Sequence, residues 1–181
     1  MPNNFLRSDT VFTTGDEELQ KKWPDFKTPI GTIEDKKQSK REVRYNHLEH
    51  GKYKLNFDGA AKGNPGQAGT GCIIRDHNGD CVWAISRKIG SDTNNEVEME
   101  AITMGLQLCR AKGIGNIDIE GDSQLCIQAA IKKEIHNWNL KGWLQKIGEL
   151  LNELKEYSLS HVYREANIFA DRLANHVVYQ E

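Results

Sequence analysis

The sequence has no long apolar run and no marked excess of either charge. Its 181 residues include 24 Lys and Arg and 26 Asp and Glu, which gives a formal net charge of −2. No apolar stretch approaches the roughly 18 residues that a membrane-spanning helix needs. The N-terminus also lacks the basic and then apolar pattern of a secretory signal. We therefore expect no membrane association, no secretion and no large basic surface.

Cysteine is scarce, and its spacing matches no metal or redox motif. The four cysteines form no C-x-x-C pair and lie in apolar or mixed segments, at Cys72, Cys81, Cys109 and Cys126. Buried, reduced thiols are the favoured interpretation. They predict an intracellular protein, and the sequence leaves nucleus and cytoplasm open.

Residues 1–50 show no sustained hydrophobic periodicity. They hold nine basic and nine acidic residues, and five of the six charges between Lys36 and Arg44 are positive. We predict that residues 1–51 are a mostly disordered arm ending in a basic linker, and that residues 52–181 fold as one domain. The linker is interpreted as solvated, with a contact to nucleic acid as the alternative.

From residue 52 onward the hydrophobic pattern is that of an α/β domain. Period-two alternation predicts five strands, at residues 53–58, 71–75, 81–89, 117–122 and 158–164. Wider apolar stripes predict four helices, which start near residues 94, 124, 140 and 168. The Asn-Gly pair at residues 78–79 predicts a hairpin, so the first three strands form an antiparallel meander.

Two aspartates stand at the carboxyl ends of predicted strands. Asp58 ends the first strand and precedes Gly59 and a glycine-rich loop, where the backbone can approach a phosphate closely. Asp122 ends the fourth strand, in the position where open α/β sheets bind ligands. An isolated Asp-Gly pair usually starts a turn, so the assignment of Asp58 depends on acids that recur downstream. Asp118-x-Glu120 lies within the fourth strand and is interpreted as a solvated strand face.

Two further acids lie near helix starts, on or beside the apolar stripe. Glu98 precedes Ala101 by three residues and so shares the buried face of its helix. Glu96 and Glu100 are each about 200° of rotation away from Glu98. Burying an unpaired carboxylate is costly, which marks Glu98 as the functional candidate of the three. Asp171 lies at the edge of the inward stripe of the last helix, where the helix dipole alone would also favour an acid.

Together, Asp58, Glu98, Asp122 and Asp171 predict a metal site. Four carboxylates near one point repel one another and raise one another's pKa values when no cation is present. Mg²⁺ relieves this conflict, because it binds a few carboxylates together with water and phosphate oxygens. Two such ions about 4 Å apart are suited to phosphodiester hydrolysis.

Four motifs carry these acids in a fixed order along the domain. They are Asp58-Gly59-Ala60 with Gly63-Asn64-Pro65-Gly66, then Thr93-Asn94-Asn95-x-x-Glu98, then Asp122-Ser123-Gln124, then Asn167-x-x-Ala170-Asp171-x-Leu173-Ala174. In this combination, residues 52–178 resemble ribonuclease H of the type 1 family. The resemblance is closest to the plant-type branch, which occurs as standalone proteins and as retrotransposon-derived domains.

The resemblance implies a ribonuclease H-like α/β fold. Its mixed five-stranded sheet has three antiparallel strands and two parallel additions, flanked by helices, with the first strand central and next to the fourth. The four acids would then bind two Mg²⁺ ions, which Mn²⁺ can replace. The positions that match contacts to the RNA strand of an RNA–DNA hybrid are Asn64, Asn94, Asn95 and Gln124. Short amides suit that role, because they can pair with the 2′-hydroxyl of RNA. Polar loop residues are the alternative interpretation.

Two features depart from the pattern of the family. Members with a catalytic histidine place it in a glycine-containing loop before the last helix, and that loop is short here. His161 falls within the fifth predicted strand, so Arg164 or Glu165 is aligned with the histidine region, and Arg164 is predicted to bind the substrate phosphate. Some relatives also carry a long basic protrusion rich in Lys and Trp, of which only a start around Trp138 and Lys141 is present.

The leading prediction is a metal-dependent endonuclease that cuts the RNA strand of RNA–DNA hybrids by a two-metal-ion mechanism and acts as a monomer. The alternative is a catalytically weak or inactive nucleic-acid-binding domain that retains the fold. Loss of any one acid would favour the alternative, and all four are present. A nuclease or integrase of the same fold acting on DNA has no support, because the asparagines favour contact with RNA.

Overall fold

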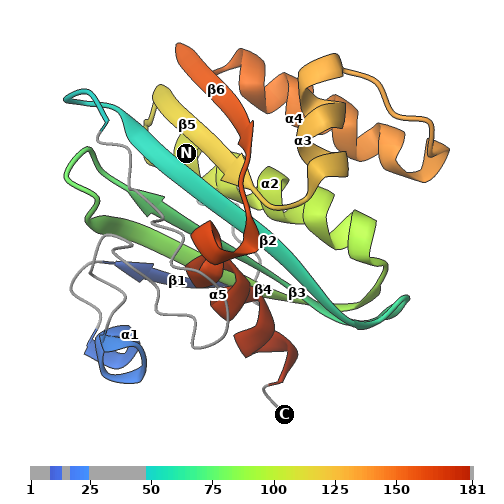
Figure 1. Ribbon diagram of the computed structural model, residues 1–181, viewed down its shortest axis with the longest axis horizontal. Helices are drawn as coiled ribbons and strands as arrows, with labels where there is room; N and C mark the ends of the chain where they lie inside the picture. Colours follow the sequence, from blue (N-terminus) through green and yellow to red (C-terminus); the bar gives the residue numbers. More distant parts are fainter. Residues whose placement is uncertain (1–8, 14–16, 25–47, 180–181) are drawn as a thin grey trace, which may run out of the picture.

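The strand that carries Asp58, β2, lies inside a six-stranded mixed sheet (Figure 1). The computed structural model describes residues 9–13, 17–24 and 48–179, and the strand order is β1-β4-β3-β2-β5-β6. The strands are β1 Asp9–Thr13, β2 Tyr53–Gly63, β3 Gly66–Arg75, β4 Cys81–Asp92, β5 Asn116–Gly121 and β6 Glu156–His161. The helices are α1 Glu17–Lys22, α2 Asn94–Ala111, α3 Gln124–Lys132, α4 Lys141–Asn152 and α5 Ile168–Val178, with 3₁₀ turns η2 Trp138–Leu140 and η3 Arg164–Ala166.

The sheet combines an antiparallel meander with two parallel strands. β2 pairs antiparallel with β3, and β3 pairs antiparallel with β4. On its other side β2 pairs in parallel with β5, and β5 pairs in parallel with β6. Parallel neighbours need a crossover, which α3 and α4 provide between β5 and β6. These pairings confirm the predicted fold class and the position of the first predicted strand beside the fourth.

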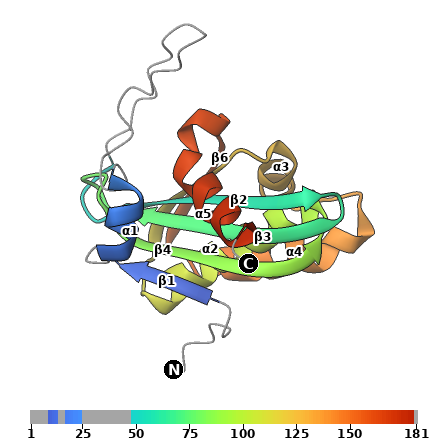
Figure 2. The same cartoon turned by 90° about the horizontal axis from the view of Figure 1, so that it is seen from below.

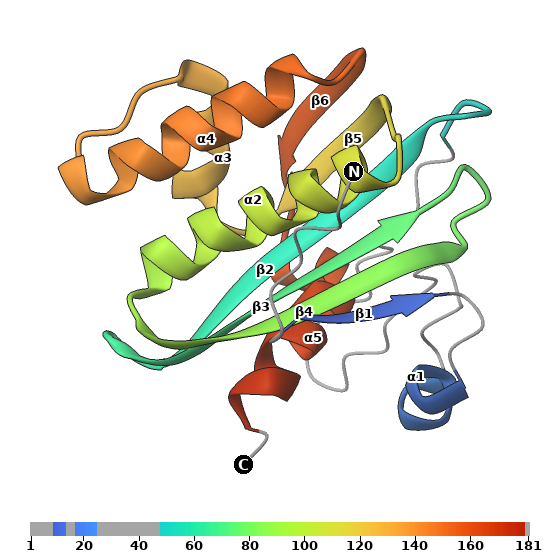
Figure 3. The same cartoon turned by 180° about the vertical axis from the view of Figure 1, so that it is seen from behind.

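Helices cover both faces of the sheet. α2 packs on β2 and β3 with α4 outside it, whereas α5 lies across β2 and β3 on the opposite face (Figures 1 and 3). Side chains of β2 divide between these layers, because they alternate from one face to the other. Leu55 and Phe57 are buried in the main core, which also contains Ile102 of α2. Asn56 and Asp58 therefore face the layer that holds α5.

The first glycine-rich segment is a strand rather than the predicted loop. β2 continues past Asp58 to Gly63 and returns through Gly66 in a tight hairpin, with Gly63 paired to Gly66. Residues 59–63 carry only small or polar side chains, so their alternation gave no hydrophobic signal. Gly59 allows close packing, since a Cβ there would lie 2.7 Å from the backbone nitrogen of Glu98. Asp58 consequently lies inside a strand and not at its end.

The N-terminal segment contributes a sixth strand, so the prediction of a disordered arm is wrong for part of it. Asp9–Thr13 pairs antiparallel with β4 at the sheet edge, and Glu17–Lys22 forms the short helix α1 (Figure 2). Among the side chains described in β1, Phe12 alone is buried, and one inward residue is too few to show a period. The predicted basic linker at Lys36–Arg44 lies outside the described residues. The domain boundary between residues 51 and 52 stays a prediction.

The cysteines occupy the interior, as predicted. All four are free and buried. Burial is the main cause that raises the pKa of Cys81 and of Cys109 to about 12, so both thiols are protonated and unreactive at neutral pH. Within the part of the chain that the structure describes, no helix combines the length and apolar character that crossing a membrane requires.

Gly71 is a position where one added methyl group should weaken the fold. A Cβ there would lie 2.4 Å from the carbonyl oxygen of Ala170 and 2.5 Å from the backbone nitrogen of Ala174, so α5 would have to move off β3. We expect Gly71→Ala to lower the free energy of unfolding by about 1–3 kcal/mol in a denaturant titration. Gly148→Ala is the control, because its Cβ meets nothing within 4 Å and alanine in α4 should add about 0.5–1 kcal/mol. Unchanged stability in Gly71→Ala would show that α5 tolerates displacement.

Candidate active site

Asp58 and Asp122 come together where the parallel pairing of β2 and β5 ends. The last paired residues are Phe57 and Gly121, and each aspartate directly follows one of them. Asp58 is only 4% exposed. Asp122 is partly buried and precedes Ser123, whose side chain caps α3. The end of the paired region, and not the end of β2 itself, therefore brings the two carboxylates together.

Glu98 enters the site from the second turn of α2, whereas the two neighbouring glutamates serve other contacts. Thr93 caps the helix, and its hydroxyl donates a 2.6 Å hydrogen bond to the Glu96 carboxylate. Glu100 forms a largely buried ion pair with Arg87 at 3.2 Å. The three glutamates have separate environments, in agreement with the predicted helical phase.

Asp58, Glu98 and Asp122 form a compact carboxylate cluster. One oxygen of each lies within 4.8 Å of the corresponding oxygens of the other two. The backbone N–H of Gly59 hydrogen-bonds to Glu98, yet Glu98 Oε2 is buried without a hydrogen-bond partner. Such an oxygen beside two further carboxylates fits a divalent cation, which prefers oxygen ligands and would remove the cost of the unpartnered atom.

The cluster strongly perturbs the protonation of its own members. Burial is the largest cause that raises the pKa of Asp58, and the charges of Glu98 and Asp122 raise it further. Burial also raises the pKa of Glu98, followed by the charge of Asp122. Both pKa values lie above the ordinary carboxylate range near 4. The fully charged cluster is therefore unfavourable until a cation neutralises it.

Asp171, the fourth predicted ligand, lies beside the cluster rather than within it. Its Oδ1 is 2.9 Å from Nη2 of Arg164 and accepts a 3.0 Å hydrogen bond from Nδ2 of Asn175. Its charge is close enough to raise the pKa of Asp58 and of Glu98. The structure thus brings three of the four predicted acids together and holds the fourth next to them.

Asn167 connects the start of α5 to Asp122 and to the backbone of Phe57, which the sequence pattern did not reveal. It directly precedes α5, where an asparagine often caps a helix, but its side chain makes no capping hydrogen bond. The residue is 1% exposed, and its Nδ2 donates to the carbonyl oxygen of Phe57 at 2.8 Å and to Oδ1 of Asp122 at 3.5 Å. The side chain is held by these donations from Nδ2, and its Oδ1, the atom that would accept a capping hydrogen bond, is buried without a partner. The available signal was the position of Asn167 in the last motif.

His161 is the last residue of β6, which confirms its interpretation as a strand residue. The strand ends there and not at Arg164, which instead begins the turn η3. Nε2 of His161 lies 3.1 Å from the backbone carbonyl oxygen of Asp122, an arrangement in which the ring N–H donates. The Arg164 side chain is 74% exposed and pairs with Asp171.

The predicted substrate-binding amides are exposed and lie at the β2–β3 hairpin tip and at two helix N-termini. Oδ1 of Asn64, at the tip of the β2–β3 hairpin, accepts a 3.1 Å hydrogen bond from the backbone N–H of Asn94. The structure therefore joins the hairpin tip to the start of α2. Asn95 follows in the same helix, and Gln124 is the first residue of α3, two positions after Asp122. In the sequence, Asn64, Asn94 and Asn95 lie between Asp58 and Glu98, and Gln124 follows Asp122.

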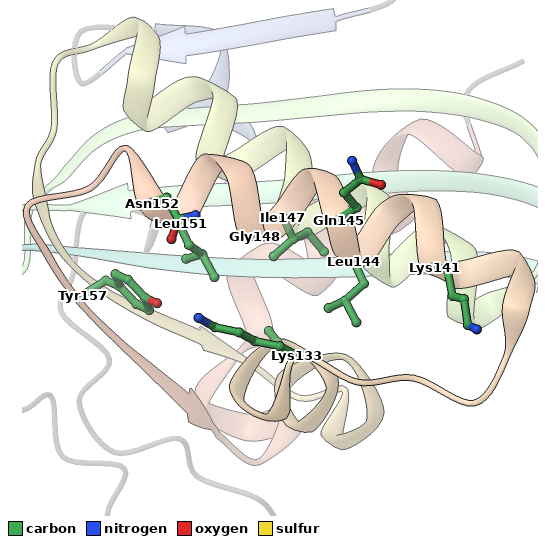
Figure 4. Close-up of a pocket in the computed structure, with 10 residues that line it drawn as sticks. Lys133, Lys141, Leu144, Gln145, Ile147, Gly148, Leu151, Asn152 and Tyr157 are labelled. Carbon is green, nitrogen blue, oxygen red and sulfur yellow. The ribbon is translucent and has the colours of Figure 1, made fainter.

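Two other features of the described residues are separate from this site. Asp118 and Glu120 form ion pairs with Lys52 at 3.3 Å and with Lys54 at 2.6 Å, so these acids belong to the strand face. A cavity of about 290 Å³ lies between α3 and α4 (Figure 4). None of the predicted metal ligands or substrate-binding residues lines it.

Sequence comparison finds relatives over most of the chain after residue 55. A family model described as reverse transcriptase-like matches residues 56–177. The chain is similar to ribonuclease HI of Halobacterium salinarum, with 35% identity over 120 residues that cover 66% of this chain and 60% of that protein. An Arabidopsis thaliana protein, named provisionally as a ribonuclease H protein, is 30% identical over 135 residues. The match covers 68% of this chain, which spans only 20% of the length of the Arabidopsis protein.

Structural comparison leads to the same group of proteins. The chain is similar to LC11-RNase H1, isolated from compost by a metagenomic approach and solved in complex with an RNA/DNA hybrid. The TM-score is 0.66 at 30% sequence identity, and the match covers 70% of this chain and 96% of that one. Nearly the whole of that protein is therefore matched, whereas a substantial part of this chain is not.

Proposed function

We propose, from the premise that this chain belongs to the ribonuclease H family, that it is a metal-dependent endonuclease which hydrolyses the RNA strand of RNA–DNA hybrids. The observation that carries this proposal is the cluster of Asp58, Glu98 and Asp122, in which one buried carboxylate oxygen has no hydrogen-bond donor. Bare carboxylates at this separation are unfavourable. The cluster is therefore best suited to a protein that works with cations bound.

In this proposal, Asp58, Glu98, Asp122 and Asp171 hold two Mg²⁺ ions. Mn²⁺ can replace them, because carboxylate and water oxygens suit both metals. When bound, the two ions supply the positive charge that activates a water nucleophile and stabilises the departing oxygen of the phosphodiester. The three clustered acids provide the central oxygens, and Asp171 adds a carboxylate from α5.

Neighbouring residues keep the acids in place and orient the substrate. Asn167 holds Asp122 beside Phe57 of β2, and the backbone N–H of Gly59 holds Glu98. The 2′-hydroxyl that distinguishes RNA is bound by side-chain amides. The proposed amides are those of Asn64, Asn94, Asn95 and Gln124.

Arg164 is proposed to bind the scissile phosphate and not to carry a proton. Its hydrogen bond to Asp171 raises its pKa further, and a guanidinium that stays protonated cannot act as a base. We expect Arg164→Ala to lower kcat/KM about 10- to 100-fold, the value of one hydrogen bond between charged groups. His161→Ala should cost no more than about 5-fold, the value of one neutral hydrogen bond. The pH–rate profile should show no step near ~6.5, where histidine titrates.

Steady-state assays of both variants at several pH values test these roles. Arg164→Lys is the matched control, because it keeps the charge and loses the forked donor geometry. If His161→Ala loses most of its activity with its fold intact, the histidine and not the arginine serves the reaction.

Incubation with an end-labelled RNA–DNA hybrid tests the proposed function directly. We expect internal cleavage of the RNA strand with Mg²⁺ or Mn²⁺ and none with EDTA. The labelled DNA strand, duplex DNA and duplex RNA should stay intact. Hybrid binding without cleavage would instead support the catalytically weak or inactive nucleic-acid-binding domain.

The proposed substrate, an RNA–DNA hybrid, is a polyanion, whereas the folded part of the chain is slightly acidic. Residues 51–181 carry fifteen Lys and Arg against seventeen Asp and Glu, whereas affinity for a duplex depends mainly on phosphate contacts. The nearest dense positive run is Lys36–Arg44, outside the described residues, and we propose it as an additional phosphate contact.

We also propose that the protein acts as a monomer inside the cell. Light scattering on the purified chain tests the oligomeric state.

A further inference from the structure

The N-terminal strand packs on the helix that carries Asp171. β1 pairs with β4 so that Phe12 lies opposite Ala84. Phe12 is 9% exposed and shares a hydrophobic cluster with Ala84 and with Phe169 and Leu173 of α5. Phe169 and Leu173 stand two residues before and two residues after Asp171. Phe12 therefore belongs to the same hydrophobic cluster as the first turns of α5, the part of the helix that belongs to the active site.

A second contact lies farther along the same helix. The ring of Trp23, just after α1, meets the ring of His176 edge-on, with centroids 5.5 Å apart. Nζ of Lys22 lies 3.1 Å from Nδ1 of His176. Trp23 also packs against the cluster that contains Phe12. The N-terminal segment thus holds α5 at two levels along its length.

This arrangement is an addition to the part of the chain that the family shares. The family model begins at residue 56, and both β1 and α1 precede it. The match to LC11-RNase H1 accounts for 96% of that protein but 70% of this chain. Any effect of residues 9–13 and 17–24 on the site would therefore come from outside the region that the family model matches.

We infer that residues 9–13 and 17–24 position α5 for the reaction, with Phe12 acting through Phe169 and Leu173 on the placement of Asp171. On the sheet side, the backbone of α5 already lies against β3 at Gly71. The helix can therefore move only away from the sheet or along it. Phe12 closes the edge of the cluster and limits that movement. Removing its ring leaves a space that neighbouring side chains fill only in part. Displacing an active-site group by about 1 Å can cost up to ~10²-fold in rate.

The test compares Phe12→Ala with Val11→Ala in the full chain. Val11 is its neighbour on the same strand, is 36% exposed and lies outside both hydrophobic clusters. We expect Phe12→Ala to speed amide hydrogen exchange in α5 while α2 keeps its protection. It should also lower kcat on the hybrid by about 10- to 100-fold with little change in KM. Val11→Ala should behave as the wild type in both measurements.

Phe12→Leu is the conservative variant and should recover most of the protection and of kcat. It also decides the question if Phe12→Ala does not fold. If Phe12→Ala matches Val11→Ala in the exchange rates of α5 and in kcat, the inference is overturned. In that case β1 merely covers the sheet edge. The kinetic part rests on the proposed function, whereas the exchange part does not. A wild-type protein without hydrolysis would refute the function, and the exchange comparison would still decide whether Phe12 holds α5.

Discussion

Asp122→Asn should remove nearly all hydrolysis of the hybrid and leave the protein folded. The carboxylate is one of three within 4.8 Å, and the loss of one charged ligand should lower kcat by about 10³-fold, or about 4 kcal/mol of transition-state stabilisation. Asparagine has the same shape, and its Oδ1 can still accept the hydrogen bond from Asn167. Cleavage at saturating Mg²⁺ and circular dichroism measure the two effects separately.

The same substitution should stabilise the metal-free protein at alkaline pH. Burial and neighbouring charges raise the pKa of Asp58 and of Glu98 above the ordinary value near 4. A carboxyl with a higher pKa in the folded chain than in the unfolded chain binds more protons when folded. The wild type therefore loses stability as the pH rises from about 4 through the raised values. Removing the charge of Asp122 lowers these pKa values, so it should recover about 1 kcal/mol near pH 9, above the pKa of Glu98 at about 8, and little near pH 4.

Urea titrations in EDTA at the two pH values measure this gain. Asp80→Asn is the control, because it removes an exposed aspartate in the β3–β4 turn and should change neither activity nor its pH dependence. Added Mg²⁺ should stabilise the wild type more than Asp122→Asn, since a cation that binds only the folded state shifts the equilibrium toward it. Full hydrolysis by Asp122→Asn, or by the wild type in EDTA, would contradict the metal site.

Glu98→Gln should cost at least about 10²-fold in kcat, because a neutral amide cannot replace a carboxylate that binds a cation. The same change at Glu96 or Glu100 should leave kcat close to the wild-type value. Glu96 accepts a hydrogen bond from the Thr93 cap, and Glu100 pairs with Arg87. Neither takes part in the carboxylate cluster.

Among these glutamate variants, the one that loses most activity should not be the one that loses most free energy of unfolding. Glu100→Gln weakens a largely buried ion pair and should lower the free energy of unfolding by about 1–3 kcal/mol. Glu98→Gln removes a carboxylate from a repulsive cluster and should not destabilise the metal-free protein. Cleavage assays and denaturant titrations on the three single variants give both quantities. Equal losses of kcat at all three positions would show that helical phase does not select the functional glutamate.

Local spacing in the sequence was enough to predict the strands of the meander, the parallel addition after α2 and the side of α2 on which Glu98 lies. These features depend on periods of two and 3.6 residues, which a few neighbouring side chains define. The order of the four motifs was likewise sufficient to suggest the family. Residues 59–63 were mistaken for a loop, because small side chains carry no such period.

Only the tertiary structure decided which groups surround the acids and how the helix of Asp171 is held. Asn167 reaches the carbonyl of Phe57 across 110 positions of the sequence, and Phe12 joins the hydrophobic cluster of Phe169 from the opposite end of the chain. One buried side chain in a five-residue strand gives no periodic signal, and an asparagine before a helix is equally compatible with a cap. Contacts of this kind depend on which sheet edges and backbone carbonyl groups are still unpaired once the rest of the sheet has formed. The sequence by itself therefore determined the helices and strands and the faces that they bury. The folded chain determined which side chains and carbonyl groups contact one another, because residues far apart in the sequence meet only after the sheet and its helices have packed together.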